Sequence, residues 1–180
     1  MINLIKSKLN LRVDFSSYDE YKKCISDLVQ NEIVWTMGSF VQHSDITCLE
    51  HSIYVSYISF LVCRRFNFDY CSAARGGLLH DFFLYDWHIK ESHDGLHGFV
   101  HPYTALRNAN KCFDLNDMEK DIIVKHMWPL TLKLPKYKEA LIVSFVDKYC
   151  AIMEIVKIGN RAIIHRLIRE RYLKGAFHEQ

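Results

Sequence analysis

Apolar residues recur three and four positions apart along nearly the whole chain, the spacing that places side chains on one face of an α-helix. Tyr21, Cys24, Ile25, Leu28 and Val29 form one such series, and Met118, Ile122 and Ile123 form another. No segment shows the sustained apolar–polar alternation of a half-buried strand. The 180 residues include only 7 Gly and 3 Pro, too few for the many tight turns of a β-sandwich. The sequence therefore predicts an all-α fold.

Two segments have the spacing of a capping box, in which the first and fourth side chains satisfy free backbone N–H groups at a helix start. They are residues 17–20, Ser-Tyr-Asp-Glu, and residues 47–50, Thr-Cys-Leu-Glu. The second box predicts a helix that continues to about Arg65.

Further helix starts are predicted at Asp69, which can cap the next helix, and at Asn116 or Asp117. Pro102 favours a helix start close to it, after a loop over residues 88–100. Two last helices are expected near residues 137–155 and 159–174.

A chain of this length is expected to form one domain, a bundle of about six to eight helices over residues 1–180. Its 23 Lys and Arg against 21 Asp and Glu give a net charge of +2, so no basic field indicates a specific nucleic-acid partner. Its apolar runs are far shorter than the roughly 20 residues of a membrane span, and we expect no membrane association.

The last predicted helix is basic and amphipathic. Its cations are Lys157, Arg161, Arg166, Arg169, Arg171 and Lys174. Such a helix can bind a membrane or RNA, but we favour a docked helix whose charged face is solvated.

Six cysteines are scattered through the chain, and none forms a C-x-x-C pair. The first residues lack the apolar stretch and cleavage site of a secretory signal. We therefore expect a cytoplasmic protein with reduced thiols and no structural disulfide.

Histidine is unusually frequent, with 10 residues. The adjacent pair His80-Asp81 follows an apolar run, but one such pair is expected by chance in a histidine-rich chain. A functional role of the pair is supported by further histidines and an aspartate that precede and follow it along the chain, namely His51, His101, His126 and Asp147. Asp147 lies within an apolar run, where an ionised carboxylate is costly unless it is paired or binds a metal.

This order of residues resembles the HD-domain superfamily of metal-dependent phosphohydrolases. The resemblance covers roughly residues 45–154 and is carried by His51, Gly77-Leu78-Leu79-His80-Asp81, His101-Pro102, Ile122 to His126, and Val146-Asp147-Lys148. It is greatest to small uncharacterised bacterial HD proteins, in the stretches Leu79 to Trp87 and His126 to Leu130. The stretches after His80-Asp81 and His126 lack the Lys and Gly-Tyr-Pro features of the cyclic-di-GMP phosphodiesterase branch.

The resemblance implies a site for two divalent metal ions. One ion would be held by His51, His80, Asp81 and Asp147, and the other by Asp81, His101 and His126. Imidazole and carboxylate ligands suit Fe, Mn, Zn or Ni better than Mg alone. Helices that meet near residues 114–116 should run antiparallel, which would bring His101 beside His126.

Other residues are weaker candidates. For catalysis beside Asp81 we consider His97 and Asp86, although a solvated loop histidine is the simpler interpretation of His97. Arg75, Lys125 and Lys148 are candidates for binding phosphate, against the alternative that they are ordinary charges on helix surfaces.

The resemblance implies an enzyme that cleaves a phosphoester, such as a nucleotide or a small phosphorylated metabolite, with a water activated by the metal ions. The alternative is an HD-like module that holds metal and senses a ligand without turnover. An oligomer is compatible with the sequence.

Overall fold

The computed structural model describes residues 15–43, 45–89, 95–156 and 162–175. Its longest helices are α5 (Cys48–Arg65) and α9 (Lys138–Ile155). The other elements are α2 (Phe15–Cys24), α3 (Ser26–Gln30), α4 (Glu32–Trp35), the 3-10 helix η1 (Thr36–Ser39), β1 (Val41–His43), β2 (Ile46–Thr47), α6 (Tyr70–Leu79), α7 (His97–Cys112), α8 (Asp117–Lys125) and α10 (Ala162–Gly175). The predicted all-α fold is confirmed, because the strands within these ranges form only one short antiparallel pair.

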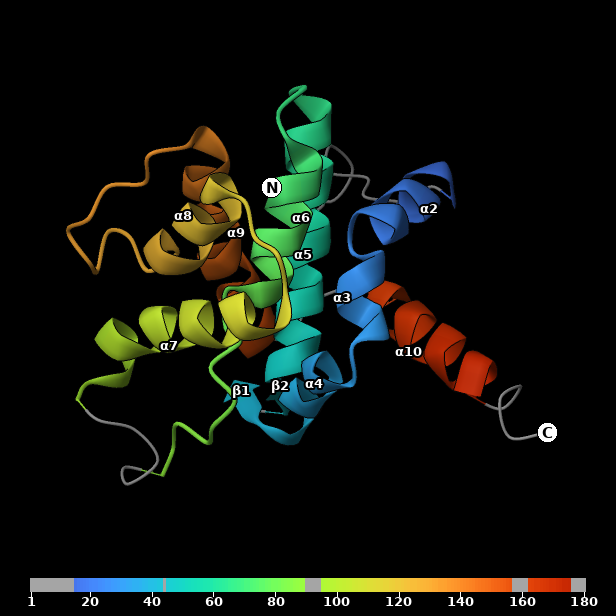
Figure 1. Ribbon diagram of the computed structural model, residues 1–180, viewed down its shortest axis with the longest axis horizontal. Helices are drawn as coiled ribbons and strands as arrows, with labels where there is room; N and C mark the ends of the chain where they lie inside the picture. The colour runs from blue at the N-terminus through green and yellow to red at the C-terminus, as the bar shows by residue number, and fades with distance from the viewer. Residues whose placement is uncertain (1–14, 44, 90–94, 157–161, 176–180) are drawn as a thin grey trace.

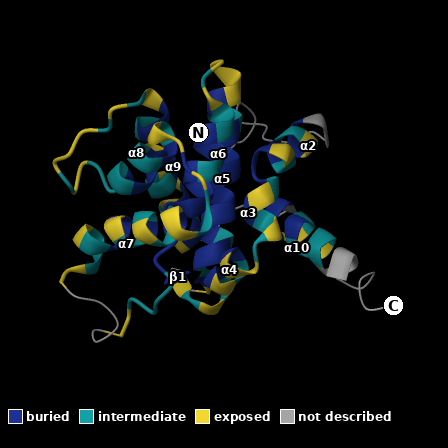
Figure 2. Ribbon diagram, in the orientation of Figure 1, coloured by how far each residue is buried: buried dark blue, intermediate teal, exposed yellow. Residues whose placement is uncertain are grey.

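Helix α5 lies at the centre of the bundle, and the other helices surround it (Figure 1). Its most extensive contacts are with α6 and then with α9, while α8 lies between α6, α7 and α9. Figure 2 shows the buried residues gathered along α5 and α6 and the exposed residues on the outer helices.

Small residues allow α5 and α6 to approach closely. A Cβ added at Gly77 would lie 3.0 Å from the backbone Cα of Ser56, and the Ser56 hydroxyl donates to the carbonyl of Ala74 at 2.6 Å. The Gly76-Gly77 pair therefore serves close helix packing, since a Cβ added at Gly76 would lie 2.7 Å from the Ile122 side chain of α8. It also fixes the C-terminal end of α6, where His80 follows, against the centre of the fold.

The predicted caps at three helix starts are confirmed. The Thr47 and Asn116 side chains each accept from the backbone N–H three residues on, in capping boxes completed by a glutamate. The Asp69 side chain accepts from the backbone N–H of Ser72. Helix α5 ends at Arg65, as expected.

Two predicted helix starts are wrong. Helix α2 is already formed at Phe15, so Ser17 lies within it and is not an N-cap. Helix α7 begins at His97, five residues before Pro102, with no side-chain cap at Leu96. The Trp87 ring, from outside the helix, stacks on the His97 ring at this start, and such a contact leaves no capping signal in the sequence.

The basic C-terminal helix docks on the bundle, as expected. Ile163, Ile164 and Leu167 of α10 are buried. The Arg166 guanidinium lies 3.6 Å from the centre of the Tyr18 ring, and Glu170 pairs with Lys22 at 2.5 Å. The α10 helix is therefore part of the fold. Lys157 and Arg161 lie outside the described residues.

The expectation that all six thiols are reduced is wrong for one pair. Cys24 in α2 and Cys71 in α6 form a disulfide that joins residues 47 positions apart. The sequence could not reveal this pair, because tertiary packing of α2 against the start of α6 brings the two cysteines together. Cys48, Cys63, Cys112 and Cys150 are free.

Replacing both Cys24 and Cys71 by serine should lower the free energy of unfolding by about 2–4 kcal/mol, because the unfolded chain loses a constraint on a long loop. Denaturant unfolding without reductant measures the change. Cys112→Ser is the control, since Cys112 is free and only partly buried. Equal stability of the double variant and the unmodified protein would contradict a disulfide in solution.

No helix in the part of the chain that the structure describes combines the length and the apolar character needed to cross a membrane.

Candidate metal centre

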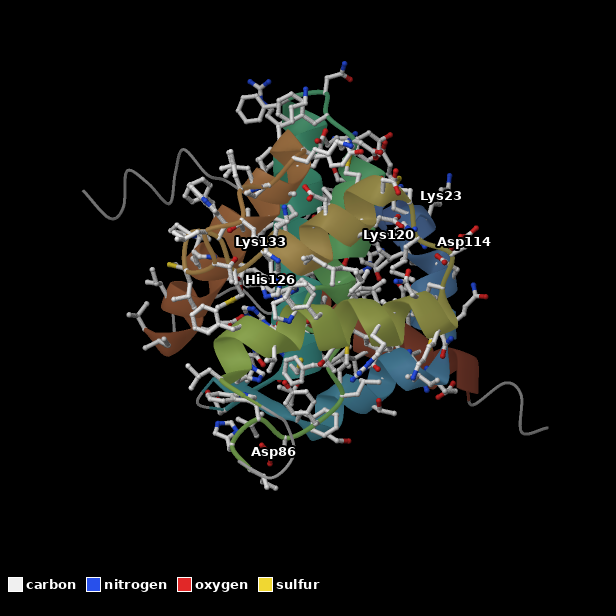
Figure 3. All side chains as sticks on the ribbon, turned by 60° about the vertical axis from the view of Figure 1, so that its left-hand side comes forward. Lys23, Asp86, Asp114, Lys120, His126 and Lys133 are labelled. Atoms are coloured by element: carbon white, nitrogen blue, oxygen red, sulfur yellow. A yellow bond between two sulfur atoms is a disulfide. The ribbon has the colours of Figure 1, made fainter. Side chains whose placement is uncertain are left out.

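Five helix segments bring the six predicted ligands together at the centre of the fold. His51 lies in the first turn of α5, and His80 and Asp81 follow the end of α6. The other three are His101 near the start of α7, His126 just after α8, and Asp147 in α9. Five of the six side chains are at most 5% exposed and Asp147 is 13% exposed. Figure 3 shows His126 near the middle of the view, between the ribbons of α8 and α7.

Three of the four imidazoles are held by the backbone through Nδ1. His80 Nδ1 lies 2.8 Å from the carbonyl of Gly77, His101 Nδ1 2.7 Å from that of His97, and His126 Nδ1 2.8 Å from that of Ile123. A carbonyl oxygen only accepts, so Nδ1 must donate in each ring. Nε2 of each ring is then the nitrogen with a lone pair available to a metal ion.

The three Nε2 atoms converge on Asp81. Its Oδ2 lies 3.3 Å from His80 Nε2, and its Oδ1 lies 3.2 Å from His101 Nε2 and 3.5 Å from His126 Nε2. Burial alone would raise the pKa of Asp81, but His80 and His101 hold it well below its usual range. The carboxylate is therefore ionised and faces three imidazoles with different oxygens.

His51 is held between two carboxylates. Its Nε2 lies 3.1 Å from Asp147 Oδ1, and its Nδ1 lies 2.8 Å from Glu154 Oε2. Burial alone would lower the pKa of His51, but hydrogen bonds to Asp147 and Glu154 raise it to about 10. Burial alone would raise the pKa of Asp147, but His51 and His80 lower it.

His101 Nε2 and His126 Nε2 lie 2.8 Å apart. Burial, with His101 and His80, lowers the pKa of His126 to about 3, so its Nε2 carries a bare lone pair. A proton or a metal ion between the two nitrogens lets them approach this closely, whereas two facing lone pairs would repel each other. The expected meeting of α7 and α8 at this point is confirmed.

The distances between the candidate ligand atoms are short enough for them to bind the same metal ion. Two ligands that bind one ion at about 2.0–2.2 Å can lie no more than about 4.4 Å apart. The distances around His51, His80 and Asp147 include 3.1 and 3.7 Å, and those around Asp81, His101 and His126 are 2.8 to 3.5 Å.

Two buried atoms at the same place lack a hydrogen-bond partner, namely His80 Nε2 and Asp81 Oδ1. A buried polar atom of this kind is costly unless a ligand satisfies it. The cluster contains two groups that could each hold an ion, His51/His80/Asp147 and His80/Asp81/His126, so His80 lies between the two positions.

Sequence reasoning missed two side chains behind the ligands. Gln42, on β1, donates from Nε2 to Asp81 Oδ2 at 2.6 Å. Glu154, in α9, accepts from His51 and is buried. Glu154 could have been found, since it follows Asp147 by seven residues and so shares its helix face. Gln42 had no such signal, because it lies in a short hairpin that periodicity did not predict.

The other two catalytic candidates lie in different surroundings. His97 stacks on His101 at 4.5 Å between ring centres, and its Nδ1 lies 3.0 Å from the Tyr85 hydroxyl, so it supports a ligand ring. Asp86 is 44% exposed and pairs with His88. Figure 3 shows Asp86 in the loop at the lower edge of the view, apart from His126.

Only one of the three phosphate-binding candidates lies beside the centre. Lys148 Nζ donates to the carbonyl of His126 at 2.8 Å and lies 3.7 Å from Asp147 Oδ2. Arg75 is engaged by Asp27 and by the buried Glu119 at the far end of α8. Lys125 donates to the carbonyl of Leu134.

Comparisons with protein families, with curated proteins and with solved structures find no match to this chain. The resemblance to HD-domain proteins therefore rests on the sequence residues that carry it.

Proposed function

We propose that this protein is a metal-dependent phosphohydrolase of the HD-domain kind. The observation that supports the proposal is the arrangement of four imidazoles, each held through Nδ1 by an acceptor, with every Nε2 facing Asp81 or Asp147. Such fixed orientation of histidines by outer partners is characteristic of protein metal sites.

Divalent ions bound here would supply Lewis acidity for phosphoryl oxygens and would lower the pKa of a water molecule. His51, His80 and Asp147 would hold one ion, and His101 and His126 the other, with Asp81 between them. Gln42 fixes one oxygen of Asp81, so that this carboxylate keeps its place among the three imidazoles.

Lys148 is the cation best placed to bind the phosphate of a substrate. Its side chain is 36% exposed, and it adjoins Asp147, the most exposed of the six ligands. Its ammonium group donates to the carbonyls of His126 and Ser144 and to the Ser144 hydroxyl, so it would exchange one of these bonds for a phosphate oxygen of a substrate that approached from this side. We propose a nucleotide or another small phosphorylated metabolite as the substrate class.

The test is hydrolysis by protein that has been stripped with a chelator and reloaded with Mn, Fe, Zn or Ni. The substrates are p-nitrophenyl phosphate, bis-p-nitrophenyl phosphate and a panel of nucleoside mono-, di- and triphosphates. We expect metal-dependent cleavage of at least one class, and loss of that cleavage on chelation. Metal-loaded protein that cleaves none of them would contradict the proposal.

One observation favours the alternative of a metal-holding module without turnover. The ligands are buried, and only Asp147 has a side chain more than 5% exposed. A module of this kind would bind the ions and gain stability from them, but would leave the whole substrate panel intact.

A further inference from the structure

The two ends of the six-ligand cluster differ in the groups that hydrogen-bond to Nδ1 of the imidazoles. At one end, Nδ1 of His51 faces the carboxylate of Glu154, whose side chain is only 5% exposed. At the other end, Nδ1 of His101 and of His126 donates to neutral backbone carbonyls. An outer carboxylate fixes the ring and makes its second nitrogen a more basic ligand.

The two ends also differ in charge. The His51 end has the carboxylates of Asp147 and Glu154, both within 3.1 Å of the ring nitrogens of His51. At the other end, Asp81 is the only carboxylate among the described residues that contacts the rings of His101 and His126. A buried cation is stabilised more strongly where more negative charge surrounds it.

We propose that Glu154 is a positioning residue that makes the His51–Asp147 end the tighter of two ion positions. Ions therefore load in sequence, first beside His51 and then between His101 and His126. Glu154 acts through His51, since its Oε2 lies 2.8 Å from Nδ1 of that ring. The inference rests on the proposed metal centre, but it concerns binding of the ions and not turnover.

The experiment is equilibrium titration of the stripped protein with Mn²⁺ alone, because carboxylate and imidazole bind this ion while thiols compete for it poorly. The unmodified protein should bind in two separate steps. Glu154→Gln keeps an acceptor for Nδ1 but removes the charge, and should weaken the first step by about 10-fold; Glu154→Ala removes both, and should weaken it by up to about 100-fold. The affinity of the second binding step should not change in either variant.

Glu139→Gln is the matched control. Glu139 is also buried in the same helix, but it accepts from the backbone N–H of Asp69, away from the six ligands. This variant should leave both steps unchanged. The thermal midpoint of every metal-free variant is measured in parallel, because a merely structural role of Glu154 would lower stability and weaken both steps equally.

Each result has a definite meaning. Equal weakening of both steps, or no weakening of the first, would overturn the role of Glu154 while leaving the metal centre intact. Absence of Mn²⁺ binding by the unmodified protein would overturn the proposed centre itself, and this inference with it. Glu154→Ala leaves no unpaired amide in the site, so it serves as the test should Glu154→Gln fail to fold.

Discussion

Asp81→Ala should abolish metal-dependent turnover and remove most of the bound metal. Asp81 faces the Nε2 atoms of three histidines, so in the proposed two-ion centre its loss would take a ligand from both positions at once. Changes to outer partners of metal ligands already reduce affinity by about 10–100-fold, and loss of a shared ligand should exceed that range. Metal analysis and the hydrolysis assay measure the two effects.

The fold should survive this change. Asp81→Ala leaves the amide of Gln42 unpaired, which costs about 1–3 kcal/mol, but it also removes a buried charge. The far-UV spectrum should stay helical. Asp114→Ala, an exposed position in the turn between α7 and α8, should change neither metal content nor activity. Near-normal turnover of Asp81→Ala would rule out the proposed catalytic centre.

If the proposed two-ion centre is correct, replacing His101 and His126 together by alanine should reduce the metal content from two ions per chain to one. These two rings meet at 2.8 Å and form one end of the cluster, whereas His51 and Asp147 form the other. The remaining ion should stay tightly bound, because its own ligands are intact. Metal analysis of reconstituted protein counts the ions.

The control for this double variant removes two histidines elsewhere, His88 and His165. Both are exposed and neither is among the six ligands. This control should retain two ions. If the His101/His126 variant also retained two ions, or if the unmodified protein held a single ion that the variant kept, these histidines would not be metal ligands.

Local sequence signals were sufficient for several helices and for the convergence of two ligands. The Thr47 and Asn116 capping boxes place the starts of α5 and α8, because a cap depends on residues only three positions apart. The antiparallel order of two consecutive helices then predicts that His101 lies beside His126, which the 2.8 Å contact confirms.

Elsewhere, contacts between distant residues overrode the local signals. The sequence predicts a loop over residues 88–100, but α7 begins within it at His97, where the Trp87 ring stacks on the His97 ring and no side chain caps the helix. Arg75 was considered for phosphate binding, yet the fold engages it with Asp27 and Glu119. A charged side chain gives the same sequence signal whether it faces a substrate or an ion pair.

The sequence by itself determined the helical class of this protein and the order of its six candidate ligands, because helix periodicity and residue chemistry are local properties. Only the tertiary structure decided which side chains hydrogen-bond to those ligands. Gln42 reaches Asp81 across 39 positions, and Glu154 reaches His51 across 103. The Cys24–Cys71 disulfide likewise spans 47 positions. Contacts of this range depend on how whole helices pack, and periodicity along the chain does not encode them.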